Sequence, residues 1–164
     1  MARMIPPRIS GDTKSPGELI LFPKFELDEQ TRSWIVLHSL NIANHVRNLE
    51  GEADFVVVVP GHGIAVIEVK AVQSIERQDG LWYLGRQQPT TRSPFDQASE
   101  AHRSIERALR AQKIDISGVP IDSFVWFTHI SRSHHIVDSP EWQPWEALYS
   151  EDRRQSVVKS REVV

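Results

Sequence analysis

The segment that most constrains the fold of this 164-residue chain runs from Gly51 to Lys70. It contains two apolar runs, Phe55 to Val59 and Ile64 to Val69, separated by Pro60-Gly61-His62-Gly63. Short apolar runs bounded by glycine and proline are typical of buried strands joined by a tight turn. The pattern therefore predicts a β-hairpin folded about Gly61, with His62 at its tip.

The polar residues at the open end of this hairpin are predicted to meet on one face. With the turn at Gly61, Asp54 lies opposite Glu68, and Glu52 lies opposite Lys70. Side chains alternate across a strand with a period of two, so all four point to the same side. Opposed Cβ atoms are about 4.5–5.5 Å apart. Two carboxylates at that separation can share one divalent metal, with an ammonium group beside them.

Two Ser-Pro sequences predict helix starts. In Ser15-Pro16-Gly17-Glu18 the serine is the N-cap, the proline takes the first helical position and the glutamate closes a capping box. Pro23 then predicts that this helix is short or kinked. Ser93-Pro94-Phe95-Asp96 has the same form, and its helix is expected to extend to about Lys113. The buried stripe of that helix is expected to comprise Ala98, Ala101, Ile105, Ala108 and Leu109.

Further strands are predicted by β-branched and aromatic runs from Trp34 to Ile42 and from Ile121 to Ile130. Asp79-Gly80 predicts a second hairpin, between Ser74 to Gln78 and Leu81 to Leu84. This order of elements indicates the α/β class, with a mixed β-sheet flanked by helices.

Three regions are expected along the chain. Residues 1–14 look like a flexible N-terminal arm, and residues 15–150 form one folded domain. Trp142, Trp145 and Leu148 belong to a final helix or an ordered segment packed on that domain. Residues 151–164 are a polar tail or linker.

Composition excludes several classes of protein. The chain has no cysteine, which excludes disulfides and thiolate zinc sites and fits a cytoplasmic protein. Its apolar runs are far shorter than the roughly 20 residues that cross a bilayer, so no membrane partner is expected. The net charge is −3, whereas nucleic-acid binders are usually basic. Binding to a polyanion would therefore depend on a local patch or on bound metal.

The polar end of the first hairpin suits magnesium chemistry. Mg²⁺ prefers hard oxygen ligands, often one or two carboxylates with water and substrate phosphate, and Mn²⁺ is expected to substitute for it. Asp54 and Glu68 supply the two carboxylates, and the backbone carbonyl of Val69 is a natural third oxygen. A metal held there would activate a bound water. Lys70 would orient that water or stabilise charge in the transition state.

The spacing of these residues resembles the Asp…Glu-x-Lys arrangement of the PD-(D/E)XK nuclease superfamily. More narrowly, the chain resembles the nuclease-related domain (NERD) family, roughly over residues 15–129. The matching pieces are Gly17-Glu18, Glu52-Ala53-Asp54, Ile67-Glu68-Val69-Lys70, Gly80-Leu81-Trp82 and Ser93-Pro94-Phe95-Asp96-Gln97.

The resemblance implies a restriction-endonuclease-like core, within residues 15–150, that cleaves DNA with Mg²⁺. Such domains are found alone or fused to a DNA helicase or a kinase. By the matching motifs, Asp54, Glu68 and Lys70 would be catalytic, and Glu18 and Gln97 would be accessory.

Each of these residues also has a structural interpretation. Asp54, Glu68 and Lys70 could form surface ion pairs at a sheet edge, although such pairs contribute only about 0–1 kcal/mol and do not require acids at the ends of such apolar strands. Glu18 could serve only as a capping residue, and Gln97 is an ordinary polar residue for a first helical turn.

Arginines provide the candidate contacts to nucleic acid. Arg103, Arg107 and Arg110 recur along one face of the second helix, and Arg86 and Arg92 lie in the loop before it. They could follow a phosphate backbone, or they could simply be a solvated helix face.

The sequence as a whole favours a Mg²⁺-dependent DNA endonuclease. The alternative is a catalytically inactive module with a nuclease fold that binds nucleic acid or a protein partner, such as the N-terminal part of a longer helicase-type protein. A homodimer is also compatible with the sequence.

Overall fold

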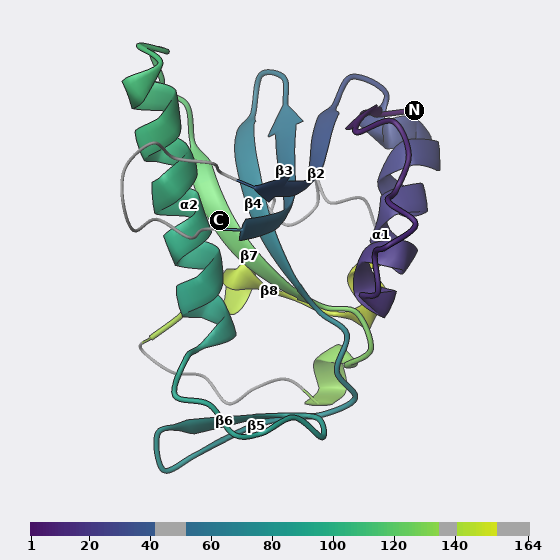
Figure 1. The fold of residues 1–164 in the computed structure, drawn as a ribbon, viewed down its shortest axis with the longest axis vertical. Helices are drawn as coiled ribbons and strands as arrows, with labels where there is room; N and C mark the ends of the chain where they lie inside the picture. The colour runs from purple at the N-terminus through teal and green to yellow at the C-terminus, as the bar shows by residue number, and fades with distance from the viewer. Residues whose placement is uncertain (42–51, 135–140, 154–164) are drawn as a thin grey trace.

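The computed structural model describes residues 1–41, 52–134 and 141–153 (Figure 1). Its strands and α-helices follow in the order β1 (Arg3–Ile5), α1 (Pro16–Leu27), β2 (Ile35–Asn41), β3 (Glu52–Val59), β4 (Gly63–Lys70), β5 (Ile75–Gln78), β6 (Leu81–Leu84), α2 (Pro94–Ala111), β7 (Ile121–Phe127) and β8 (Ala147–Leu148). Short 3-10 helices cover Glu29–Thr31, Arg132–His134, Pro144–Glu146 and Ser150–Arg153.

The main sheet has six strands in the described part of the chain, in the order β1-β2-β3-β4-β7-β8. The pairs β2-β3 and β3-β4 are antiparallel, whereas β1-β2, β4-β7 and β7-β8 are parallel. β5 and β6 form a separate two-stranded sheet. The predicted α/β class with a mixed sheet flanked by helices is confirmed, and β3 and β4 occupy the centre of the sheet.

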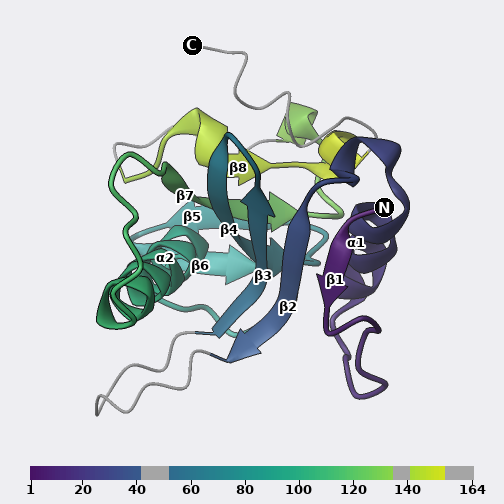
Figure 2. The same ribbon diagram turned by 90° about the horizontal axis from the view of Figure 1, so that it is seen from above.

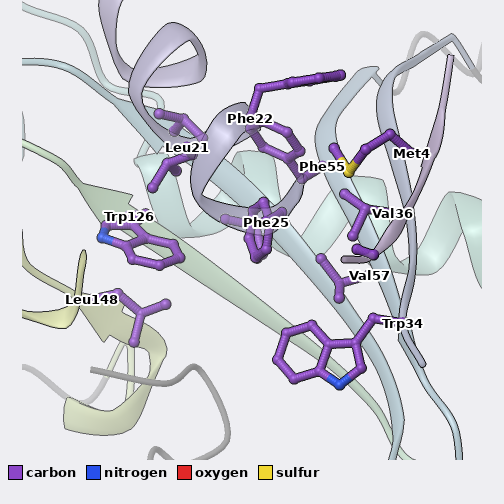
Figure 3. Close-up of a cluster of buried hydrophobic side chains, with 13 residues drawn as sticks. Met4, Leu21, Phe22, Phe25, Trp34, Val36, Phe55, Val57, Trp126 and Leu148 are labelled. Atoms are coloured by element: carbon purple, nitrogen blue, oxygen red, sulfur yellow. The ribbon is translucent and has the colours of Figure 1, made fainter. Parts of the chain in front are cut away.

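The two helices cover opposite faces of the sheet (Figure 2). Against one face, α1 packs Leu21, Phe22 and Phe25 onto side chains such as Phe55 and Trp126 (Figure 3). Against the other face, α2 packs its stripe on the sheet: Ala101 and Ile105 meet β3 and β4, and Phe95 and Ala98 meet β7 and the β5–β6 hairpin. The predicted stripe is therefore confirmed, with Ala108 and Leu109 half-buried at its end.

The first helix does not end at Pro23, the residue that predicted a short or kinked helix. It runs for 12 residues, ending at Leu27. A proline removes its own N–H and leaves the carbonyl four residues earlier without that donor. Both Pro23 and Leu19 are exposed, so water can satisfy the Leu19 carbonyl. The cost of the proline is therefore low on this face.

The N-terminal arm also differs from the expectation. Residues 3–5 form an edge strand that pairs in parallel with β2, and Ala2 and Met4 are buried. Two buried apolar side chains stabilise this short strand although the segment is rich in proline and charge.

At the other end of the chain, the segment around Trp142 supplies β8 and buries Trp142 and Leu148. The predicted tail, residues 151–164, begins inside the short 3-10 helix Ser150–Arg153. Asp152 of this helix forms an ion pair with Arg132 at 2.7 Å. Residues 154–164 lie outside the described part of the chain.

Both predicted hairpins are present. In the first, the register runs from Val59↔Gly63 to Phe55↔Ile67, as expected for a turn about Gly61. In the second, Asp79 and Gly80 both have positive φ, of 50° and 77°, as a two-residue hairpin turn requires.

No helix in the described residues is long and apolar enough to cross a membrane.

Candidate active site

Asp54 lies where the pairing of β3 with β4 ends. The β3–β4 pairing stops at Phe55↔Ile67, and the β2–β3 pairing skips Ser39 and Asp54 before it resumes at Leu40↔Ala53. Ser39 there has a left-handed backbone, with φ of 50°. In place of a ladder carbonyl, Asp54 Oδ2 accepts a hydrogen bond from the backbone N–H of Val69 at 2.7 Å. The break in pairing thus ties the Asp54 carboxylate to the end of β4.

Glu68 and Lys70 project from the same end of β4. Lys70 Nζ donates to Glu68 Oε1 at 2.6 Å and to Gln97 Oε1, in the first turn of α2, at 2.9 Å. The side chains of Glu68 and Lys70 are only 12% and 18% exposed. The structure therefore brings Glu68, Lys70 and Gln97 together directly, and Val69 links them to Asp54.

The electrostatics of Asp54 show that negative charge is crowded here. Burial, followed by the charge of Glu68, raises its pKa from 3.8 to about 7. The Val69 hydrogen bond lowers the pKa, the charge of Glu18 raises it further, and the Lys70 ammonium lowers it. The lysine and the backbone N–H do not compensate for the burial and repulsion. A bound cation would do so.

Glu18 reaches the site from the first turn of α1. The helix start lies very close to β4, because a Cβ built on Gly17 would overlap Val69 Cγ1 and press on Thr128 Oγ1. Ser15 Oγ accepts from Glu18 N–H at 3.4 Å, which is half of the predicted capping box. The Glu18 carboxylate is directed instead at β2, where its Oε2 lies 2.7 Å from His38 Nε2. Ser39 Oγ also donates to that oxygen, at 3.3 Å.

His38 and Ser39 were not among the predicted site residues. His38 is buried, and it lies on the same side of β2 as Val36. A histidine at an inward position of a strand, two residues after the buried Val36, is a sequence signal for a buried polar contact. Its partner could not be inferred, because Glu18 is 20 residues away on a helix.

The residues present fit a hard divalent cation. Within the described part of the chain, Asp54 Oδ1 and Glu68 Oε2 have no hydrogen-bond partner, since the bonds above use the other oxygen of each carboxylate. The Val69 N–H points toward Asp54, and the N–H and C=O of one strand residue face the same side, so the Val69 carbonyl also faces Asp54.

No group of three or more His, Asp or Glu side chains forms a complete metal cage among the described residues. The chain therefore offers two carboxylates and one carbonyl, a set that leaves positions for water and phosphate. The side chain of Glu52, predicted to oppose Lys70, lies outside what the structure describes.

Both helices begin at the end of the sheet that holds these carboxylates. In Figure 1, α1 and α2 start at the lower end, where β4 leaves the sheet toward the β5–β6 hairpin. Ser15 and Ser93 cap the two helices, with Pro16 and Pro94 following. Helix N-terminal ends carry partial positive charge and favour anions. The arrangement adds attraction for phosphate beside an acidic site.

The predicted arginines are placed differently from one another. Arg86 is exposed just after β6, and Arg92 forms an ion pair with Glu100 at 2.5 Å. Along α2, Arg103 donates to Ser99, Arg107 donates to the Arg103 carbonyl, and Arg110 pairs with Glu106. At about 1.5 Å per residue, Arg110 lies roughly 20 Å along the helix from Gln97. Arg110 is therefore the predicted arginine of α2 that lies farthest from the candidate site.

Fold and site together define an α/β protein with a six-stranded mixed sheet, consistent with a nuclease-like core. The family model described as the nuclease-related domain matches residues 14–128, and the chain belongs to that family. The matched range includes Glu18, Asp54, Glu68, Lys70 and Gln97 and ends just beyond β7. Comparison with curated proteins and with solved structures found no match.

Proposed function

We propose that this domain is a metal-dependent DNA endonuclease, with Mg²⁺ held by Asp54, Glu68 and the Val69 carbonyl. The observation that carries the proposal is the convergence of Asp54, Glu68 and Lys70 at one end of β4, with one oxygen of each carboxylate left unpartnered. Burial and the charge of Glu68, which raise the pKa of Asp54, support it. A pair that only stabilised the fold would neutralise its charges more completely. Bound Mg²⁺ would supply Lewis-acid stabilisation of the phosphoryl charge and activation of water.

Lys70 is the residue that would act on the reacting groups. An ammonium has three N–H donors, and Glu68 and Gln97 accept two of them. The third can be directed at the attacking water or at a non-bridging phosphate oxygen. In the proposed step the water oxygen would bond to phosphorus and release one proton to solvent. The bond from phosphorus to the leaving sugar oxygen would break, and that oxygen would take up a proton from solvent.

Gln97 would hold Lys70 in this position. Its Oε1 accepts from Nζ at 2.9 Å, and a helix start fixes its backbone. Without Gln97, the lysine would keep its ion pair with Glu68 but lose the second point that sets its direction. Substituting Gln97 should therefore weaken catalysis without abolishing it.

The proposal is tested by cleavage of supercoiled plasmid and of single-stranded DNA with Mg²⁺ or Mn²⁺. We expect Glu68→Ala and Lys70→Ala to lower the cleavage rate by at least about a thousandfold, since each removes several kcal/mol of transition-state stabilisation. His62→Ala is the matched control, because His62 lies at the exposed turn of the same hairpin.

Cleavage that survives both substitutions would rule out this mechanism. If the wild-type protein binds DNA but shows no cleavage with either metal, the inactive binding module is supported instead.

A further inference from the structure

His38 is a buried histidine to which the proposed chemistry assigns no role. Its side chain is 1% exposed, and its Nε2 lies 2.7 Å from Glu18 Oε2. A carboxylate oxygen accepts hydrogen bonds, so the imidazole N–H donates. Ser39 Oγ lies 3.2 Å from the same nitrogen and 3.3 Å from the same oxygen. Glu18 is thus held by two donors from adjacent residues of β2.

Aromatic contacts fix the orientation of this imidazole. Phe22 packs edge-on against it, with ring centroids 5.4 Å apart, and Phe55 is tilted against it at 4.8 Å. Phe22 lies one turn after Glu18 on α1, on the same helix face. Phe55 directly follows Asp54 on β3. His38 therefore connects the helix that carries Glu18 to the strand that carries Asp54.

A purely structural role would not explain where the carboxylate is held. Glu18 directly follows Gly17, which packs so closely on the Val69 side chain that a Cβ there would overlap it, so α1 brings the carboxylate to the end of β4 that holds Glu68. Two carboxylates repel each other, so an unrestrained Glu18 would rotate toward solvent. Its side chain nevertheless stays 12% exposed. Glu18 also already has its backbone N–H capped by Ser15, so the contact with His38 is not needed to begin the helix.

We propose that His38 is a positioning residue of the active site, whose buried Nε2–H holds the Glu18 carboxylate beside the metal-binding pair. This inference rests on the proposed function. Groups that orient a metal site from outside its ligands typically affect metal affinity or activity by about 10–100-fold. His38 would act only through Glu18, which makes the two residues energetically dependent on each other.

The test is calorimetric titration of the full chain with MnCl₂ alone, for His38 variants, Glu18→Gln and the double variants. His38→Phe keeps an aromatic ring between Phe22 and Phe55 but has no donor. His38→Gln places an amide N–H near the position of Nε2, whereas the shorter His38→Asn does not. We expect His38→Phe and His38→Asn to weaken Mn²⁺ binding about tenfold and His38→Gln to restore binding to within about threefold of wild type.

Coupling to Glu18 separates positioning from general destabilisation. Combined with Glu18→Gln, His38→Asn should cause no further loss of Mn²⁺ affinity. Thermal melting checks that each variant folds. If His38→Phe does not fold, the comparison of His38→Asn with His38→Gln still tests the positioning role. Wild-type affinity in both His38→Phe and His38→Asn, or losses that multiply with Glu18→Gln, would overturn the assignment.

The proposed function can fail separately. Wild-type protein that binds Mn²⁺ but cleaves no DNA would contradict the nuclease proposal, while the same titrations would still decide the role of His38. Wild-type protein that binds no Mn²⁺ would overturn both.

Discussion

At the turn end of the β3–β4 hairpin, the ladder is complete up to Val59↔Gly63, and Gly63 packs against the backbone of Pro120. At the open end, the pairing of β3 with β4 stops before Asp54 and Glu68. There, Asp54 is held by a single backbone N–H and its pKa is raised to about 7, chiefly by burial. The same two strands thus end in regular packing at one side and in crowded charge at the other.

This difference indicates which properties each end contributes. Residues at the turn end lower the free energy of the folded state, and their loss should reduce stability without touching the chemistry. The crowded carboxylates at the open end raise that free energy when no cation is bound, and loss of the Asp54 charge should abolish chemistry while increasing stability. Active sites commonly show this opposition between stability and function.

The largest expected effect comes from Asp54→Asn. The folded-state pKa of Asp54 is about 7, above its ordinary value of 3.8. Between those values the folded state binds more protons than the unfolded state, so stability falls as pH rises through this window. Above pH 7 the full penalty remains, on the order of 2–4 kcal/mol. The side-chain oxygen of asparagine can still accept the hydrogen bond from the Val69 N–H, but asparagine carries no charge.

Metal-free Asp54→Asn should therefore be more stable than wild type at pH 8, and equally stable near pH 3, while its DNA cleavage falls by about a thousandfold or more. Denaturant unfolding at the two pH values measures the first effect. A variant that is less stable than wild type at pH 8 would show that Asp54 is a structural residue.

Glycine substitutions at the two ends should separate stability from chemistry. Gly63 has φ of 141°, and a Cβ there would overlap the Pro120 carbonyl oxygen, so Gly63→Ala should cost about 2–3 kcal/mol. Gly17→Ala should cost a similar amount or less, because the overlap is with the side chain of Val69. Only Gly17→Ala displaces Glu18 from the site.

When cleavage rates are compared per folded molecule, Gly63→Ala should match wild type and Gly17→Ala should be slower by about tenfold. Equal rates in the two variants would mean that the placement of α1 does not matter for the reaction.

Metal binding should depend on pH through Asp54. A cation competes with the proton on that carboxylate, so Mn²⁺ affinity should fall by about tenfold for each pH unit below about 7 and level off above it. Calorimetry in buffers of different ionisation enthalpy should detect release of about one proton at pH 6 and almost none at pH 8.5. Affinity that does not change between these values would contradict the raised pKa.

The smallest expected effects concern the arginines. Arg86→Ala should weaken binding to a short duplex by about two- to fivefold and reduce the salt dependence by about one charge. Arg110→Ala should have little effect, because it is paired with Glu106 and remote from Gln97. Fluorescence anisotropy without divalent metal measures the affinity and salt dependence of both variants. A larger effect at Arg110 than at Arg86 would indicate that the DNA runs along α2.

Much of this arrangement follows from local sequence patterns. The register of β3 and β4 could be predicted because one glycine-rich turn joins two apolar runs, and the start of α2 could be predicted from Ser93 and Pro94. Whether the carboxylates function in catalysis remains a prediction from the same pattern.

Features that depend on distant contacts were not predictable. The helix continues through Pro23 because that face is exposed. β1 forms because Ala2 and Met4 are buried against residues that lie far away in the sequence. The contact of His38 with Glu18 depends on how α1 crosses the sheet, and the close packing of Gly17 on Val69 sets that crossing. Sequence periodicity carries no information about such crossings.

The most direct measurement is an anomalous difference map from crystals soaked in MnCl₂. If Asp54 and Glu68 hold the metal, one strong peak is expected at the open end of the β3–β4 hairpin, within about 2–2.5 Å of an oxygen of each residue. The same soak of Asp54→Asn crystals should show a much weaker peak. Protein that cleaves DNA with Mn²⁺ while the peak lies elsewhere, or while no peak forms at saturating Mn²⁺, would contradict this expectation.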